Sequence, residues 1–226
     1  MEKKVTNLKG ENIAVIVKTA IDFDGRVNAQ LDALAARYPE HLISLFLLPD
    51  KETSIEFPDN VVVKEIKLIS RRLPKSALWQ FFKIIEYALN ICLKLILLNP
   101  KIVHVHDESS ILGPLIFKLI KMNTPLIYDD HELKNIPAND VREKLMFYLE
   151  KTIFQIAEIS IMCNERRRRV VNKVFQPKQT VVIENLFYER ERNNTDIISQ
   201  NLLSRMDSIQ STGKKILLHQ GVLNKG

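Results

Sequence analysis

Short apolar runs alternate along the chain with longer segments in which apolar residues recur every three or four positions. Buried strands separated by helical segments are typical of a parallel sheet whose strands are joined by crossover helices. The pattern predicts strands at 13–17, 42–48, 61–69, 102–105, 126–128, 159–163 and 181–183. We therefore expect an α/β fold, a Rossmann-like parallel sheet of about seven strands with helices on both faces.

The segments between these strands have the period of helices, which are expected at 27–38, 76–98, 111–122, 141–157 and 166–174. The helix at 76–98 is unusually apolar, because its polar residues form one narrow stripe, Gln80, Lys83, Glu86, Asn90 and Lys94. Two interpretations stay open. It is either a core or domain-interface helix, or a helix that lies in a bilayer interface with its cations facing lipid phosphates.

A change of composition after residue 188 predicts three parts. Residues 1–188 form the Rossmann-like domain, and 189–213 form a polar linker and a helix. At 214–226 a new apolar strand and a glycine-bearing loop begin, and we expect them to be the start of a second domain. A lone strand cannot bury itself, so the expectation is a truncated chain or one that depends on a missing part.

Composition narrows the class of protein. With 46% hydrophobic and 27% charged residues the chain is neither disordered nor a disulfide scaffold. The two cysteines lie in apolar runs, where a thiol packs as a small hydrophobe. The first residues lack the apolar core of a secretory signal, and no apolar stretch is long enough to span a membrane. We expect a cytoplasmic protein.

The formal charge of +6 favours phosphorylated or other anionic partners. Its densest part is the basic run 166–169, at the start of a predicted helix with valines behind it. No aromatic residues alternate with these arginines, so a stacking platform for bases is not expected. We predict a solvated helix face and no nucleic-acid partner.

Polar residues gather in the loops that follow the predicted strands. In a parallel sheet these loops share one edge, where ligands bind. Gly25 and Arg26 stand where the first loop meets a helix N-terminus, and free amides with a guanidinium can hold a phosphate there. The alternative is that Gly25 only permits a turn and Arg26 is a solvated helix-start residue. The chain has neither GxGxxG nor a P-loop motif.

Two further loops concentrate three histidines and four carboxylates, namely His104, His106, Asp107, Asp129, Asp130, His131 and Glu132. His104 lies deeper in its strand and is expected to be a core histidine. His131 and Glu132 lie past a strand end and are the better functional candidates. No HExxH, paired CxxC or GxSxG motif occurs, so neither a metal site nor a serine hydrolase is expected.

The order of these loops resembles the N-terminal half of glycosyltransferase family 4, the retaining enzymes of GT-B fold. The matching segments are DGRV at 24–27, IVHVHD at 102–107, PLIYDDHE at 125–132, AEISI at 157–161, VIEN at 182–185 and LLHQGVLNKG at 217–226. Each segment alone is a weak motif. Their order and spacing, over nearly the whole chain, carry the resemblance.

The resemblance implies a glycosyltransferase of the hexosyltransferase type that uses a nucleotide-sugar donor, no metal and no other cofactor. The acceptor is a glycan or a lipid-linked sugar, as in surface polysaccharide biosynthesis, and a peripheral contact at the inner face of the membrane is compatible with it. In such enzymes the N-terminal domain holds the acceptor and the C-terminal domain holds the donor.

Roles follow for single residues by the same resemblance. His131 is the catalytic candidate near the transferred sugar, and Gly25 with Arg26 approaches the donor phosphates. The acceptor or the cleft is lined by His106, Asp107, Asp130 and Glu132. The chain alone is expected to be inactive, because most of the donor domain is missing. The alternative is a non-catalytic Rossmann-like module that binds a phosphorylated ligand or a protein partner.

Overall fold

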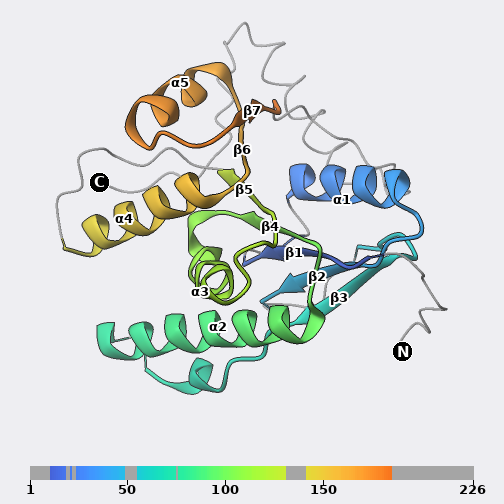
Figure 1. Ribbon diagram of the computed structural model, residues 1–226. Coiled ribbons are helices and arrows are strands. Elements are labelled where there is room, and N and C mark those ends of the chain that lie inside the picture. Colours follow the sequence, from blue (N-terminus) through green and yellow to red (C-terminus); the bar gives the residue numbers. More distant parts are fainter. Residues whose placement is uncertain are drawn as a thin grey trace, which may run out of the picture. The chain divides into compact units, whose positions relative to one another are not determined.

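The computed structural model describes residues 11–18, 21, 24–48, 55–74, 76–130 and 141–184. Within them, one parallel sheet has the strand order β3-β2-β1-β4-β5-β6-β7 (Figure 1). Its strands are β1 (Ile13–Val17), β2 (Ile43–Leu47), β3 (Val61–Glu65), β4 (Ile102–His106), β5 (Leu126–Asp130), β6 (Ile159–Met162) and β7 (Thr180–Val182). The predicted fold class is confirmed. The chain reverses its direction across the sheet between β1 and β4, and such switch points commonly hold ligands.

Five α-helices join these strands in the part of the chain that the structure describes. They are α1 (Gly25–Arg37), α2 (Ala77–Leu98), α3 (Leu112–Ile120), α4 (Val141–Ile156) and α5 (Glu165–Val174). The 3₁₀ turns η2 (Ile69–Arg72) and η3 (Glu108–Ser110) lie in the connections after β3 and β4. The predicted boundaries at 188 and 213, and the elements expected beyond them, lie outside the described residues.

The sheet is covered on both faces, as the apolar strands predict (Figure 1). On one face, α1 packs its Val27 and Leu31 against strand residues such as Val15 and Leu45. On the other face, α2 and α3 cover Ile16 and its neighbours, and α4 adds apolar side chains to the same cluster. All five residues of β1 and of β2 are buried, which explains why both sequences are apolar except for Ser44.

The strand predicted at 61–69 is too long at its C-terminal end. Its last residue is Glu65, and Ile69 begins the turn η2 instead. The neighbouring strand β2 ends at Leu47, whose backbone oxygen accepts the N–H of Ile66 (2.8 Å). Further on, the carboxylate of Glu86 of α2 accepts hydrogen bonds from the backbone N–H groups of Ile69 (2.6 Å) and Ser70 (2.8 Å). These contacts take the two amides away from any strand partner. The turn is thereby fixed against α2.

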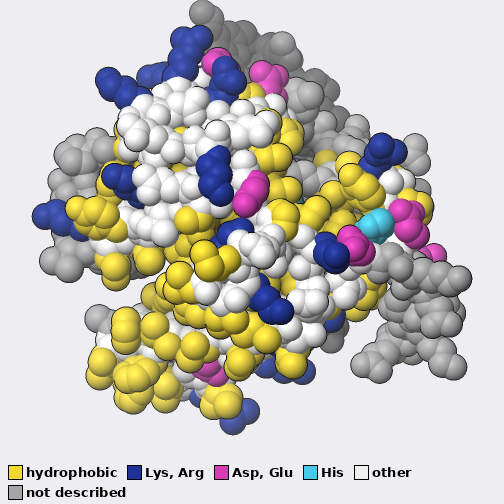
Figure 2. Space-filling model, in the orientation of Figure 1, with side chains coloured by type: hydrophobic (Ala, Val, Ile, Leu, Met, Phe, Trp, Pro, Cys, Tyr) yellow, Lys and Arg dark blue, Asp and Glu magenta, His cyan; other side chains and the backbone are white. Residues whose placement is uncertain are grey.

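The surface of helix α2 has three different sides. Tyr87, Ala88 and Ile91 are buried against the sheet and α3, while Lys83 and Glu86 hold the segment around η2. The third side is apolar and exposed, and Figure 2 shows hydrophobic side chains gathered over this part of the molecule. Only some of the apolar residues predicted for the helix at 76–98 are therefore buried in the core. No described helix meets the length and hydropathy that crossing a membrane requires.

Close packing of α3 on α2 depends on Gly113. A Cβ atom at this position would lie 2.7 Å from Cγ2 of Ile91 and 2.9 Å from the backbone oxygen of Ala88. Both distances are shorter than van der Waals contact, so any larger residue would push the helices apart. Pro114 follows in the first turn of α3, where its missing N–H costs no helical hydrogen bond.

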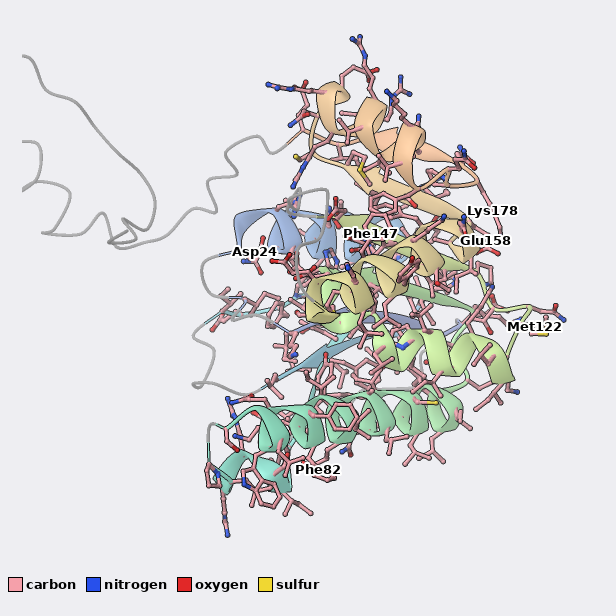
Figure 3. All side chains as sticks on the ribbon, turned by 90° about the vertical axis from the view of Figure 1, so that its left-hand side faces the viewer. Asp24, Phe82, Met122, Phe147, Glu158 and Lys178 are labelled. Atoms are coloured by element: carbon pink, nitrogen blue, oxygen red, sulfur yellow. The ribbon has the colours of Figure 1, made fainter. Side chains whose placement is uncertain are left out.

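Glu158 links three elements at the edge of the sheet where the strands have their amino ends. Its carboxylate accepts a hydrogen bond from the N–H of Leu126 (3.1 Å) and lies 3.4 Å from Nζ of Lys118 and 3.6 Å from Nζ of Lys178 (Figure 3). Partial burial raises the pKa of Glu158, but the amide and the two lysines outweigh it and hold the pKa below the ordinary value of 4.5.

This depressed pKa predicts how stability depends on pH. A group with a lowered pKa in the folded state stabilises the protein above its unfolded pKa, and the contribution is lost as the pH falls through the folded pKa. A Glu158→Gln variant should therefore unfold at lower urea concentration than the wild type at pH 7, with the two midpoints converging below pH 4.5. Midpoints that stay equally far apart down to acid pH would contradict the assignment.

Candidate functional site

The carboxyl ends of β1, β4 and β5 lie side by side, because these strands are neighbours in the sheet. The strand register pairs His106 of β4 with Asp129 of β5. Helix α1 begins just after β1, and its first residues reach the same edge. The side chain of Asp24 caps this helix by accepting a hydrogen bond from the N–H of Val27 (3.2 Å). Within the described residues, the predicted polar positions after β1 and at the ends of β4 and β5 thus lie at one edge.

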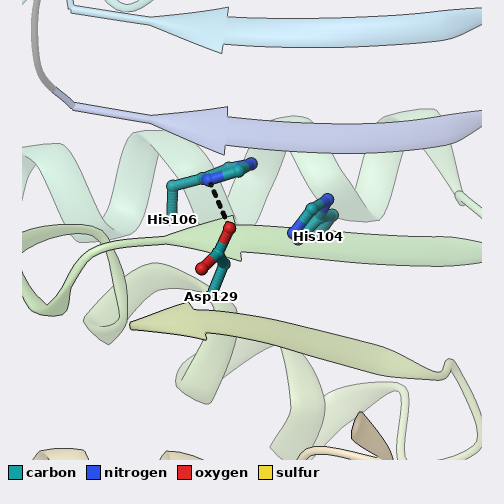
Figure 4. A group of neighbouring side chains, drawn as sticks. All are labelled: His104, His106 and Asp129. Atoms are coloured by element: carbon teal, nitrogen blue, oxygen red, sulfur yellow. Dashed lines mark ion pairs between the residues drawn. The ribbon is translucent and has the colours of Figure 1, made fainter. Parts of the chain in front are cut away.

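The centre of this site is the fully buried carboxylate of Asp129. Oδ2 accepts a hydrogen bond from Nε2 of Gln30 (2.8 Å) and lies 3.5 Å from Nδ1 of His106 (Figure 4). Oδ1 lies 3.8 Å from Nη1 of Arg26. Arg26 and Gln30 are four residues apart, so both project from the same face of α1. A buried charge must be paired, and α1 supplies two of its partners.

His104 adjoins this cluster from a position deeper in β4. It is buried, as predicted, and its ring centroid lies 4.2 Å from that of His106 with the planes tilted by 37°. Alternation along the strand places both rings on the face that α1 covers. His104 therefore restricts how His106 can move, although sequence reasoning had set it apart from the site.

His104, His106 and Asp129 also have the donor types of a metal site, with one donor atom from each within 4.8 Å of the others. Arg26 places a positive charge beside the same carboxylate, where it would compete with a metal ion. The arrangement fits an ion-paired carboxylate that orients a histidine better than it fits a metal ligand set.

Asp107 and Asp130 lie on the other face of the sheet, where they surround Tyr128. The hydroxyl of Tyr128 donates to Oε1 of the buried Glu150 (3.4 Å). Burial raises the pKa of Tyr128 well above its ordinary value, and the carboxylates of Asp130, Glu150 and Asp107 raise it further. This hydroxyl therefore stays protonated. The predicted site residues are divided between two clusters by the alternation of strand side chains.

The backbone of Asp107 is strained, with φ 60° and ψ 152°, a region that residues other than glycine rarely adopt. Two hydrogen bonds hold it, from the N–H of Asp107 to the oxygen of Asp129 (3.1 Å) and from the N–H of Ser110 to the oxygen of Asp107 (3.1 Å). Such strain costs about 1–3 kcal/mol and is frequent at functional sites. The turn after β4 is thereby fixed beside the carboxyl edge.

Sequence reasoning missed Lys18, which directly follows β1 at the same edge. Its Nζ donates to the backbone oxygen of Ser109 (3.4 Å) and lies 5.1 Å from the ring centroid of Tyr87. Burial lowers the pKa of Lys18, and burial raises the pKa of Tyr87 to about 12. The position of Lys18 one residue after a buried strand was the available signal. Gln30 was missed too, and its spacing of four from Arg26 would have revealed it.

Two other predicted groups have a different outcome. His131 and Glu132 lie outside the described residues, so their roles stay predictions. The basic run 166–169 belongs to α5, where Nη2 of Arg168 pairs with Oε1 of Glu165 (2.8 Å) along the helix. Exposed ion pairs of this kind are typical of a solvated helix face, as expected.

No family model matches the sequence, and a search of the curated proteins finds no match. Solved structures do match. UDP-glucose: anthocyanidin 3-O-glucosyltransferase in complex with UDP has a TM-score of 0.62 at 12% identity, with 88% of this chain and 58% of that chain covered. A ugt transferase from Siraitia grosvenorii in complex with UDP matches with a TM-score of 0.58 at 9% identity, and the match covers 88% of this chain and 55% of that chain. Sucrose-phosphate synthase from Thermosynechococcus elongatus matches with a TM-score of 0.55 at 17% identity, and the match covers 77% of this chain and 48% of that chain.

At these identities the likeness shows the fold alone. The chain has the Rossmann-like architecture of a domain of GT-B glycosyltransferases, and it spans about half the length of the three chains compared. Membership of family 4 stays a prediction, since the matching structures include GT-B enzymes of several kinds.

The buried ion pair predicts a large effect of Asp129 on stability. An Asp129→Ala variant leaves the guanidinium of Arg26, 10% exposed, without this carboxylate, which should lower the free energy of unfolding by about 3 kcal/mol. The matched control is Glu65→Ala, which removes an exposed partner 3.9 Å from Lys67 and should cost less than about 0.5 kcal/mol. Urea denaturation measures both. Equal losses in the two variants would refute the role of Asp129.

Proposed function

We propose that this chain is the N-terminal part of a retaining glycosyltransferase that moves a sugar from a nucleotide-sugar to a glycan or lipid-linked acceptor. A role in surface polysaccharide biosynthesis, in the cytoplasm, belongs to the same proposal. The observation that supports it best is the cluster of Arg26, His106 and Asp129 at the switch point of the sheet. Enzymes of the same fold were solved with UDP bound.

Arg26 and the start of α1 suit an anionic leaving group. Negative charge develops on the diphosphate as the bond to the sugar breaks, and fixed positive groups lower the barrier by stabilising it. The first amides of a helix and a guanidinium are both of this kind. Asp129, which accepts a hydrogen bond from Gln30, orients the guanidinium before any ligand arrives, so little reorganisation is needed during the reaction.

His106 suits a role on the sugar or acceptor side. A carboxylate beside Nδ1 favours the tautomer with a proton on that nitrogen, and the imidazole is thereby held in one orientation. In a retaining transfer assisted by the leaving diphosphate, the protein need not supply a nucleophile. In this proposal His131 is the residue nearest the transferred sugar, while Asp107, Asp130 and Glu132 shape the acceptor side.

Arg26→Ala in the complete enzyme tests the role in leaving-group stabilisation. We expect kcat/KM to fall about 100-fold, with the larger part in kcat, because the lost interaction is strongest in the transition state. Arg37→Ala is the matched control, since Arg37 ends the same helix at the opposite edge of the sheet. Arg26→Lys should recover only part of the activity, because lysine lacks the planar fork. An unchanged kcat/KM in Arg26→Ala would exclude the proposed role.

The 226-residue chain itself is expected to show no sustained glycosyl transfer, because the donor is held mainly by the domain that follows in such enzymes. A screen of nucleotide-sugars with the chain and with the complete gene product measures this. Turnover by the chain alone would overturn the prediction of a fragment. Failure of the complete product with every donor would instead favour a non-catalytic binding module.

A further inference from the structure

Helix α2 carries a second apolar side that is about half exposed to solvent. Leu78, Phe82, Leu89 and Leu93 are spaced by four and seven residues, so they lie on one side of the helix. Their exposed fractions are 61%, 47%, 49% and 59%. Opposite to them, residues such as Ile91 are buried in the core. A contiguous exposed apolar stripe of this length marks an interaction surface rather than chance exposure.

Aromatic side chains gather at the first turns of the stripe. The ring centroid of Phe82 lies 5.7 Å from that of Trp79 and 6.1 Å from that of Phe81. Figure 3 shows Phe82 on the outer side of α2, turned away from the sheet. Trp and other amphipathic rings favour the boundary between water and lipid. The first turns of α2 thus contain an aromatic residue type, Trp, that favours the boundary between water and lipid.

Cations flank the same turns. Glu86 accepts the amides of Ile69 and Ser70, and Nζ of Lys83 donates to the oxygen of Leu73 (2.9 Å). These contacts hold η2, which contains the exposed Arg71 and Arg72, along the first turns of α2 that also carry the aromatic cluster.

A second cationic group lies further along the helix. Burial lowers the pKa of Lys64, and the charge of the neighbouring Lys94 lowers it further. The sequence of α2 contains one acid, Glu86, whose oxygens are occupied by the two amides. Lys94 belongs to the polar side of α2 with Lys83, so the cations nearest the apolar stripe are those of η2, and the one acid of α2 is engaged by the two amides.

We propose that the stripe of Leu78, Phe82, Leu89 and Leu93 docks the protein on an anionic membrane surface. The helix lies along the bilayer, the apolar side chains enter the boundary of headgroups and acyl chains, and the cations meet lipid phosphates. A second copy of the chain is a poorer occupant. A symmetric dimer through this stripe would bring the positive charge of Arg71 and Arg72 of both copies into one interface. The proposal does not depend on glycosyl transfer.

Vesicle sedimentation tests the proposal with the 226-residue protein. We expect binding to vesicles of phosphatidylglycerol and phosphatidylcholine, weaker binding at high salt, and little binding to phosphatidylcholine alone. Leu89→Gln with Leu93→Gln should weaken binding at least about tenfold, since burial of each leucine is lost. The matched control removes two exposed apolar groups from α4, Leu145→Gln with Tyr148→Gln, and should bind like the wild type.

A second double variant, Arg71→Gln with Arg72→Gln, should bind less tightly and respond less to salt. Circular dichroism establishes that each variant is folded, which is expected because all the substituted residues are exposed. Absence of wild-type binding to anionic vesicles would overturn the proposal. So would equal binding by the α2 and α4 variants. A wild type that dimerises in sedimentation velocity and is made monomeric by the α2 substitutions, without binding vesicles, would assign the stripe to self-association instead.

Discussion

The carboxyl edge of this sheet depends on one buried carboxylate. Asp129 has no exposed side-chain surface, so its charge is tolerable only with partners close by. Arg26 and Gln30 come from α1, and His106 comes from the adjacent strand. The same contacts therefore dock α1 on the sheet and orient a cation and an imidazole toward the switch point. Stability and the geometry of the site have a common origin here.

Alternation along β4 and β5 then decides which polar residues can act together. His106 and Asp129 share the face covered by α1, whereas Asp107 and Asp130 belong to the cluster around Tyr128 on the opposite face. The turn that follows β4 crosses the edge with a strained backbone at Asp107. A ligand at the edge can meet both clusters only from above the strand ends. This is where ligands bind in open parallel sheets.

Helix α2 shows how one segment can satisfy two demands. The core requires one apolar side, and the anchoring of η2 requires the polar stripe with Lys83 and Glu86. Neither demand explains the exposed leucines and phenylalanines that remain. A surface that is costly in water persists when another phase or partner covers it.

The sequence by itself determined the fold class, the number of strands and the edge where polar loops meet, because these follow from local period and from parallel strand direction. Only the tertiary structure decided which neighbours each polar residue has. The pairing of Arg26 and Gln30 with Asp129 spans about a hundred positions in the chain, and Glu86 fixes a turn where a strand was predicted by accepting the amides of Ile69 and Ser70. Such contacts depend on how helices pack, which periodicity does not encode. The exposed side of α2 was likewise fixed by which apolar residues the sheet and α3 left uncovered.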